Sequence, residues 1–136
     1  MSTNQAANGA DALPEQFRCI RLQRAREVGH PEGDRDIGYV IIAPLMSDGR
    51  LDPELAHSYR EHCTVARFRP DTEVMHGRLR RRPGGSWAFH YDLPDHTEDE
   101  DAGYRLGDHR FAPGEYVTIA EDDAAHTYRV IAVETI

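Results

Sequence analysis

The stretch VMHGRLRRRPGGSWAFHYD, residues 74–92, decides how the rest of the chain is organised. Its second half places an aromatic residue at every second position from Trp87 to Tyr91. A period of two is typical of a strand with one buried face. Between the two halves lies Pro83-Gly84-Gly85, and glycine tolerates the positive φ angles that a tight turn needs. The stretch therefore predicts a β-hairpin.

The length of the hairpin loop decides which side chains face the core. A loop of three residues pairs Leu79 with Phe89 and places Gly77 near Tyr91, whereas a two- or four-residue loop would put arginines beside the aromatic residues. A slip of one residue turns every side chain to the wrong face, so the burial pattern favours the three-residue loop. The expected outer face, and our predicted partner surface, consists of His76, Arg78, Arg80, Arg82 and His90.

Composition indicates one globular domain. The chain has 136 residues, of which 39% are hydrophobic and 29% charged, enough to bury a core. We expect residues 1–15 to be a disordered tail and 16–136 to be a single domain. No apolar run approaches the ~18–20 residues of a membrane span. The N-terminus also lacks the apolar segment of a secretory signal, so we predict a cytoplasmic protein. Two cysteines, Cys19 and Cys63, are too few for a disulfide framework and are expected to be reduced.

The net charge and the basic residues indicate which kinds of partner the protein could bind. All 16 basic residues are arginine, which we interpret mainly as the coding bias of a GC-rich genome. The net charge of −8 argues against nucleic-acid binding through the overall field of the protein. A local arginine patch can still bind an acidic protein or ligand.

Short strands separated by turns dominate the rest of the chain. One helix is expected over about 52–63, because Asp52 is a good N-cap and Pro53 suits the first helical position. Six to eight strands with one helix predict a mainly β (α+β) fold, either a small antiparallel barrel or a strongly curved sheet. The expected strands are 17–24, 39–45, 64–69, 74–82, 86–92, 104–111, 115–120 and 126–134.

The last two strands form a second predicted hairpin. A four-residue loop, 122–125, would pair Val117 with Val130 and Ile119 with Tyr128. This register leaves a second apolar face that needs a cover, supplied by the helix or by a second copy in a homodimer. That face consists of Tyr116, Ile131 and Val133.

Histidines and acidic residues suggest alternative sites. His62 falls within the apolar stripe of the predicted helix, so it is expected to be partly buried, as a packed residue or a general base. In the loop at 29–36, His30, Asp34 and Asp36 could gather around a cation. No zinc-binding spacing, nucleophile motif or phosphate-binding loop is present, so no catalytic residue, metal or cofactor is predicted. The remaining polar residues of the helix are expected on its solvated face: Glu54, His57 and Glu61.

Two segments, RRPGGSWAFHYD and FAPGEYVTIAEDDAAHTYRVIAVE, resemble a family of short alphaproteobacterial proteins with no assigned activity. The resemblance extends from about Arg21 to the C-terminus and implies no catalytic residue. The final hairpin is also similar to those of small SH3-like barrels, which is an analogy of fold alone.

These observations favour a non-catalytic binding module that uses the arginine-rich hairpin face. A metal-binding protein or small enzyme using His62 or the loop with His30, Asp34 and Asp36 is the second hypothesis. A single-stranded nucleic-acid binder is the third, and the burial expected for the aromatic residues leaves it without a stacking platform.

Overall fold

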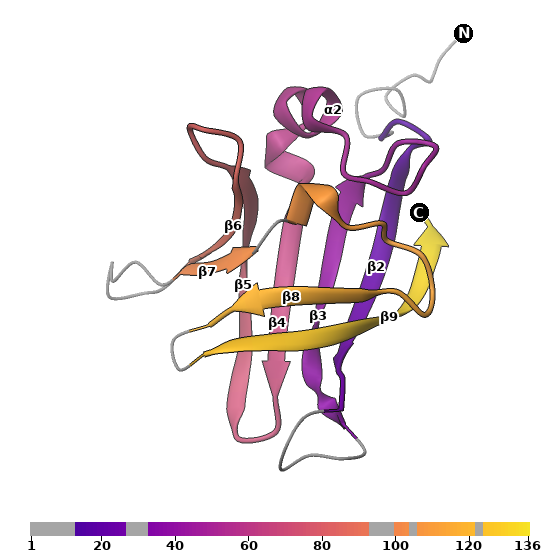
Figure 1. The fold of residues 1–136 in the computed structure, drawn as a ribbon. Coiled ribbons are helices and arrows are strands. Elements are labelled where there is room, and N and C mark those ends of the chain that lie inside the picture. Colours follow the sequence, from indigo (N-terminus) through magenta and orange to yellow (C-terminus); the bar gives the residue numbers. More distant parts are fainter. Residues whose placement is uncertain (1–12, 27–32, 93–99, 104–105, 122–123) are drawn as a thin grey trace, which may run out of the picture.

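An antiparallel sheet that closes on itself forms the body of the protein (Figure 1). The computed structural model describes residues 13–26, 33–92, 100–103, 106–121 and 124–136. Each described strand is antiparallel to the next, and β9 pairs with β2 to close the barrel. The fold class predicted from the sequence is confirmed. The described strands are β2 (Phe17–Arg24), β3 (Asp34–Pro44), β4 (Thr64–Arg69), β5 (Thr72–Arg81), β6 (Trp87–Tyr91), β7 (Glu100–Gly103), β8 (Tyr116–Ala120) and β9 (Ala125–Thr135).

The central hairpin has the predicted register. Leu79 lies opposite Phe89 and Gly77 opposite Tyr91, and the Arg82 amide donates to the Ser86 carbonyl at 2.7 Å. The turn uses positive φ angles of 94° and 93° at its two glycines, a conformation that side chains disfavour. The three-residue loop is therefore confirmed.

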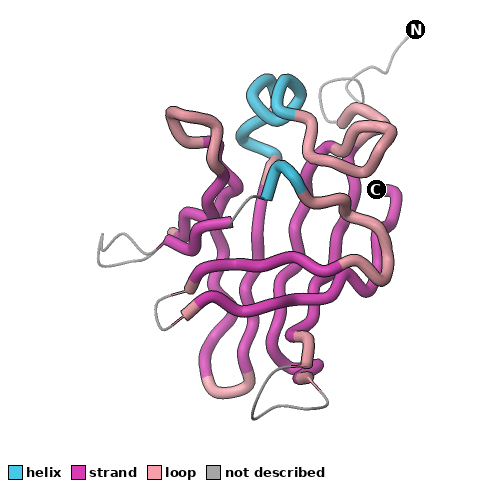
Figure 2. The backbone as a smooth tube through the Cα atoms, viewed as in Figure 1, coloured by secondary structure: helices cyan, strands magenta, loops and turns pink. Residues whose placement is uncertain are grey.

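The helix closes one end of the barrel, where β3 ends and β4 begins (Figure 2). As predicted, Asp52 caps it by accepting hydrogen bonds from the amides of Glu54 and Leu55, both at 3.1 Å. The α-helix, α2, covers only Pro53–Ser58, and a 3₁₀ turn follows at Arg60–His62.

The helix is shorter than predicted, and this changes the environment of His62. The change from α-helix to 3₁₀ turn rotates the residues after Tyr59 relative to the predicted stripe. His62 is therefore exposed, with its ring 6.4 Å from that of Tyr59. The prediction of a partly buried histidine is wrong.

Residues 106–111 do not form the strand that was predicted over 104–111. Residues 104–105 lie outside the described residues, and Leu106–Asp108 is a 3₁₀ turn whose Leu106 is buried in the core. The glycine and aspartate of this turn favour a tight bend over an extended strand. The described strand nearest to this region is β7, which lies before the predicted strand in the chain.

The last hairpin has the predicted faces but a register shifted by two residues. Val117 pairs with Tyr128 and Ile119 with His126, because the loop is 121–124 and its first residue turns into the barrel. A shift of two keeps each side chain on its face.

A β-bulge corrects the prediction for Val133. Leu22 of β2 pairs with Val130, whereas Arg21 pairs with Ala132, so Ile131 is the extra residue. One extra residue reverses the alternation beyond it. Val133 therefore lies opposite Ile20 and packs against the core.

Aromatic rings fill the barrel interior. The Tyr39 ring centroid lies 5.2 Å from that of Phe89 and 5.0 Å from that of Tyr128. Most of the predicted tail lies outside the described residues, but Leu13 packs against this core.

Candidate functional site

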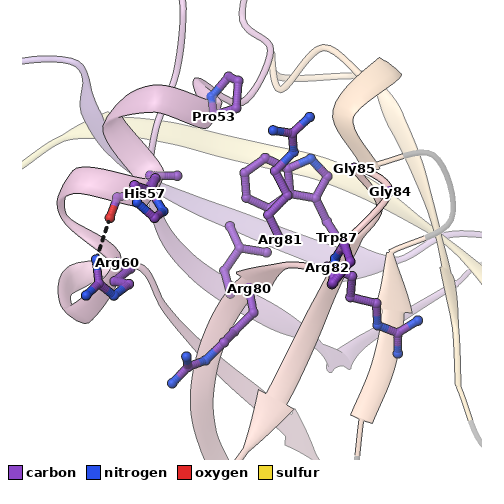
Figure 3. Close-up of a pocket in the computed structure, with 12 residues that line it drawn as sticks. Pro53, His57, Arg60, Arg80, Arg81, Arg82, Gly84, Gly85 and Trp87 are labelled. Atoms are coloured by element: carbon purple, nitrogen blue, oxygen red, sulfur yellow. Dashed lines mark hydrogen bonds between the residues drawn. The ribbon is translucent and has the colours of Figure 1, made fainter.

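A pocket of about 700 Å³ lies between α2 and the tip of the β5–β6 hairpin (Figure 3). Its apolar wall is made by the helix and by two core residues that reach the end of the barrel. Its polar groups are almost all cationic, and no Asp or Glu is among the described residues that line it. The lining residues used below are Pro53, His57, Arg60, Leu79, Arg80, Arg81, Arg82 and Trp87.

Arg81 lies beside the tryptophan that forms part of the apolar wall. Its guanidinium carbon lies 6.0 Å from the centre of the Trp87 ring, the limiting distance for a cation–π contact. Figure 3 shows this guanidinium beside the indole, whereas those of Arg80 and Arg82 point away from it and from each other. On the helix side, Arg60 donates to the His57 carbonyl at 3.2 Å. The cationic groups thus surround an apolar patch on several sides.

Three of these arginines have no acidic partner in the part of the chain that the structure describes. Arg60, Arg80 and Arg81 form no ion pair with a described carboxylate. The three form a cationic cluster in a chain whose net charge is −8. It creates a local positive field.

Two of the five residues of the predicted partner surface line this pocket. They are Arg80 and Arg82. Arg78 instead forms an ion pair with Glu61 at 3.1 Å. Together with His76 it lines a separate groove on the outside of β4 and β5, and His90 lies opposite Arg78. The predicted partner surface is therefore split between this pocket and a separate groove.

Sequence reasoning missed Arg81, Arg60 and His57 as site residues. Arg81 lies on the inward-facing register of β5, but the strand ends at the mouth of the barrel, so the side chain reaches solvent. An arginine at an inward-facing position of a strand indicates that the strand reaches the end of the barrel there, and this was the signal in the sequence that could have identified Arg81. His57 is exposed, as are Glu54 and Glu61, which confirms the predicted solvated face of the helix.

A second polar group lies at the other end of the barrel, where β2 and β4 end and β8 turns into β9. The side chain of Glu121 is 1% exposed and accepts hydrogen bonds from the Tyr39 hydroxyl at 2.6 Å and from the Tyr128 hydroxyl. Its other oxygen accepts from Arg24 at 3.3 Å and from Arg69 at 2.5 Å. We call these five residues the Glu121 cluster.

The neighbours of Glu121 in this cluster offset the effect of burial on its pKa. Burial alone would raise the pKa of Glu121, but hydrogen bonds from Tyr128 and Tyr39 and the charge of Arg69 hold its pKa below the ordinary value. Burial and the neighbouring carboxylate raise the pKa of Tyr128, so this phenol stays protonated. The carboxylate is enclosed, and its partners leave it no position for a substrate. The arrangement is that of a structural ion pair.

The other candidate groups remain dispersed among the described residues. His30 lies outside them, and Asp34 accepts a hydrogen bond from the Asp36 amide at 2.9 Å. No group of three or more possible metal ligands occurs in the described part of the chain. Cys19 and Cys63 are free thiols, as expected. Burial raises the pKa of Cys63 to about 11, so this thiol is protonated near neutral pH.

The apolar face of the last hairpin is smaller than predicted. Tyr116 is 57% exposed and Ile131 is 44% exposed, whereas Val133 has turned into the core. The two exposed residues border a groove with Arg26 and Arg129. The helix lies at the end of the barrel and contacts β3, so it does not supply the predicted cover.

No family model, curated protein or solved structure matches the chain. The resemblance to short alphaproteobacterial proteins stays a prediction. Among the described residues, no helix has the length and apolar character needed to cross a bilayer.

Proposed function

We propose that the chain is a non-catalytic binding module that accepts an anionic partner in the pocket between α2 and the β5–β6 hairpin. The observation that supports this function best is the position of Arg60, Arg80 and Arg81 around an apolar wall, since none of the three forms an ion pair with a described carboxylate. A guanidinium forms strong charge-assisted hydrogen bonds with carboxylates and phosphates. The apolar wall would contact the uncharged part of the same ligand.

Anion binding can be tested most directly at Arg81, because this residue lies beside Trp87, the one tryptophan of the chain. We expect phenyl phosphate and benzoate to change the fluorescence of Trp87 in a saturable way. Benzylammonium, with a similar ring and the opposite charge, should have no such effect. Replacing Arg81 with Gln should weaken phenyl phosphate binding about tenfold, which corresponds to losing one charge-assisted interaction of ~1.4 kcal/mol.

The matched control is Arg21→Gln, which removes the same charge from an exposed ion pair with Glu134 on β2 and β9. It should bind phenyl phosphate as the wild type does. Equal binding of phenyl phosphate and benzylammonium, or equal losses in the two variants, would contradict the proposed function.

We also retain the proposed homodimer, now through Tyr116 and Ile131. Because Arg26 and Arg129 border these residues, two copies would bring like charges together, and salt would screen their repulsion. We therefore expect light scattering to show an increase from one to two chains with rising protein concentration, at lower concentration in high salt. A single chain at every concentration would contradict this prediction. The cytoplasmic location expected from the sequence stays a prediction.

A further inference from the structure

The spacing of the cationic groups around the pocket indicates what kind of anion they fit. Figure 3 shows the guanidiniums of Arg60 and Arg80 on one side of the apolar wall and that of Arg81 on another. A compact anion such as phosphate that contacts Arg81 would lie on a different side of the wall from Arg60 and Arg80. An extended chain with several negative charges can meet both sides.

The wall between the arginines is apolar. Pro53 and Leu79 line it together with Trp87, and the pocket volume of about 700 Å³ exceeds what a carboxylate alone would fill. An uncharged side chain in this space would exclude water from its walls. Burying an aromatic side chain is among the larger single contributions to association.

The surroundings of Trp87 favour a peptide over a nucleic acid as this extended anion. Trp87 is only 4% exposed, and Arg81 already lies beside its ring, so a base has no free aromatic face on which to stack. Nucleic-acid affinity depends mainly on a basic track along many phosphates. Here the nearest further arginine on the strand, Arg78, is neutralised by Glu61.

We infer that the pocket binds an acidic peptide segment that carries one aromatic or aliphatic side chain. That side chain enters between α2 and the hairpin, and carboxylates on either side of it meet Arg81 and the pair Arg60 and Arg80. This inference rests on the proposed function, because it requires the same pocket to bind anions.

The test compares synthetic peptides by the fluorescence of Trp87. The peptide DEDFDED, acetylated and amidated, should bind at least about tenfold more tightly than DEDGDED, which lacks the aromatic side chain. KRKFKRK should not bind. The double variant Arg60→Gln/Arg80→Gln should lose at least about tenfold more affinity for DEDFDED than for phenyl phosphate. The reason is that only the extended ligand reaches both sides of the wall. Both residues are exposed, so the variant should keep the circular dichroism spectrum of the wild type.

Several results would overturn the inference while leaving the proposed function intact. They are phenyl phosphate binding with no preference for DEDFDED over DEDGDED, equal losses of both ligands in the double variant, and tighter binding of a short oligothymidylate than of DEDFDED. Loss of phenyl phosphate binding itself would overturn both. Arg21→Gln serves again as the control for a charge removed far from the pocket.

Discussion

Replacing Glu121 with Gln should destabilise the protein by about 3–5 kcal/mol, the cost typical of breaking a buried ion pair from one side. The amide keeps the shape of the side chain but removes the charge that two arginines face. Arg24 is 7% exposed, so its guanidinium would lose the charge of Glu121 in a place with little access to water. The measurement is urea unfolding followed by the fluorescence of Trp87.

The matched control is Glu115→Gln. Glu115 also forms an ion pair, with Arg110 at 3.4 Å, but the two side chains are 45% and 61% exposed. Exposed pairs contribute little, so this variant should lose less than about 1 kcal/mol. Similar losses in the two variants would contradict the structural role of the Glu121 cluster.

We also expect the difference in stability between the wild type and Glu121→Gln to depend on pH. The folded state holds the pKa of Glu121 below its ordinary value, so the carboxylate binds a proton more readily in the unfolded chain. Its contribution to stability is fully present above the unfolded pKa of about 4.3 and is lost as pH falls through the folded pKa. The difference in unfolding free energy between wild type and Glu121→Gln should be constant near neutral pH and should shrink in acid. A constant difference down to low pH would contradict the direction of the shift.

The fold could be predicted from local patterns where burial alternates along a strand. The central hairpin was found in register because only one loop length buries Leu79 with Phe89. The register of the last hairpin was not found, because Glu121 in the sequence EDDAAH resembles an exposed turn residue. Its inward turn depends on arginines from distant strands. The bulge at Ile131 likewise depends on pairing with β2, which no local pattern reports.

The candidate site could be predicted only in part. Arg80 and Arg82 followed from the alternation of the strand, but the neutralisation of Arg78 by Glu61 required the position of the helix relative to β5. His57 and Arg60 became site residues for the same reason. Sequence periodicity shows which face a side chain occupies, and it does not show which element lies opposite that face.

Gly77 shows how closely the strands that carry the site approach one another. It lies in β5 opposite Tyr91, and a Cβ atom there would lie 2.2 Å from the His90 carbonyl oxygen and 2.7 Å from the Tyr91 Cα. Both neighbours are backbone atoms, so neither can rotate aside. Gly77→Ala should therefore force β5 and β6 apart at a cost of about 3 kcal/mol or more, the upper part of the range for overpacking.

The hairpin tip offers a matched control in Gly84→Ala. Gly84 has a φ of +94° but no heavy atom within 4 Å of the added Cβ, so only backbone strain of about 1–2 kcal/mol should appear. Urea unfolding of both variants separates steric overlap from strain. Because the strand pair at Gly77 continues to the arginines and Trp87 at the pocket, folded Gly77→Ala should also bind phenyl phosphate more weakly than the wild type does. Equal stability of the two variants would show that separating β5 and β6 costs no more than the strain at Gly84, and the pocket would then lack the rigid wall that selective binding requires.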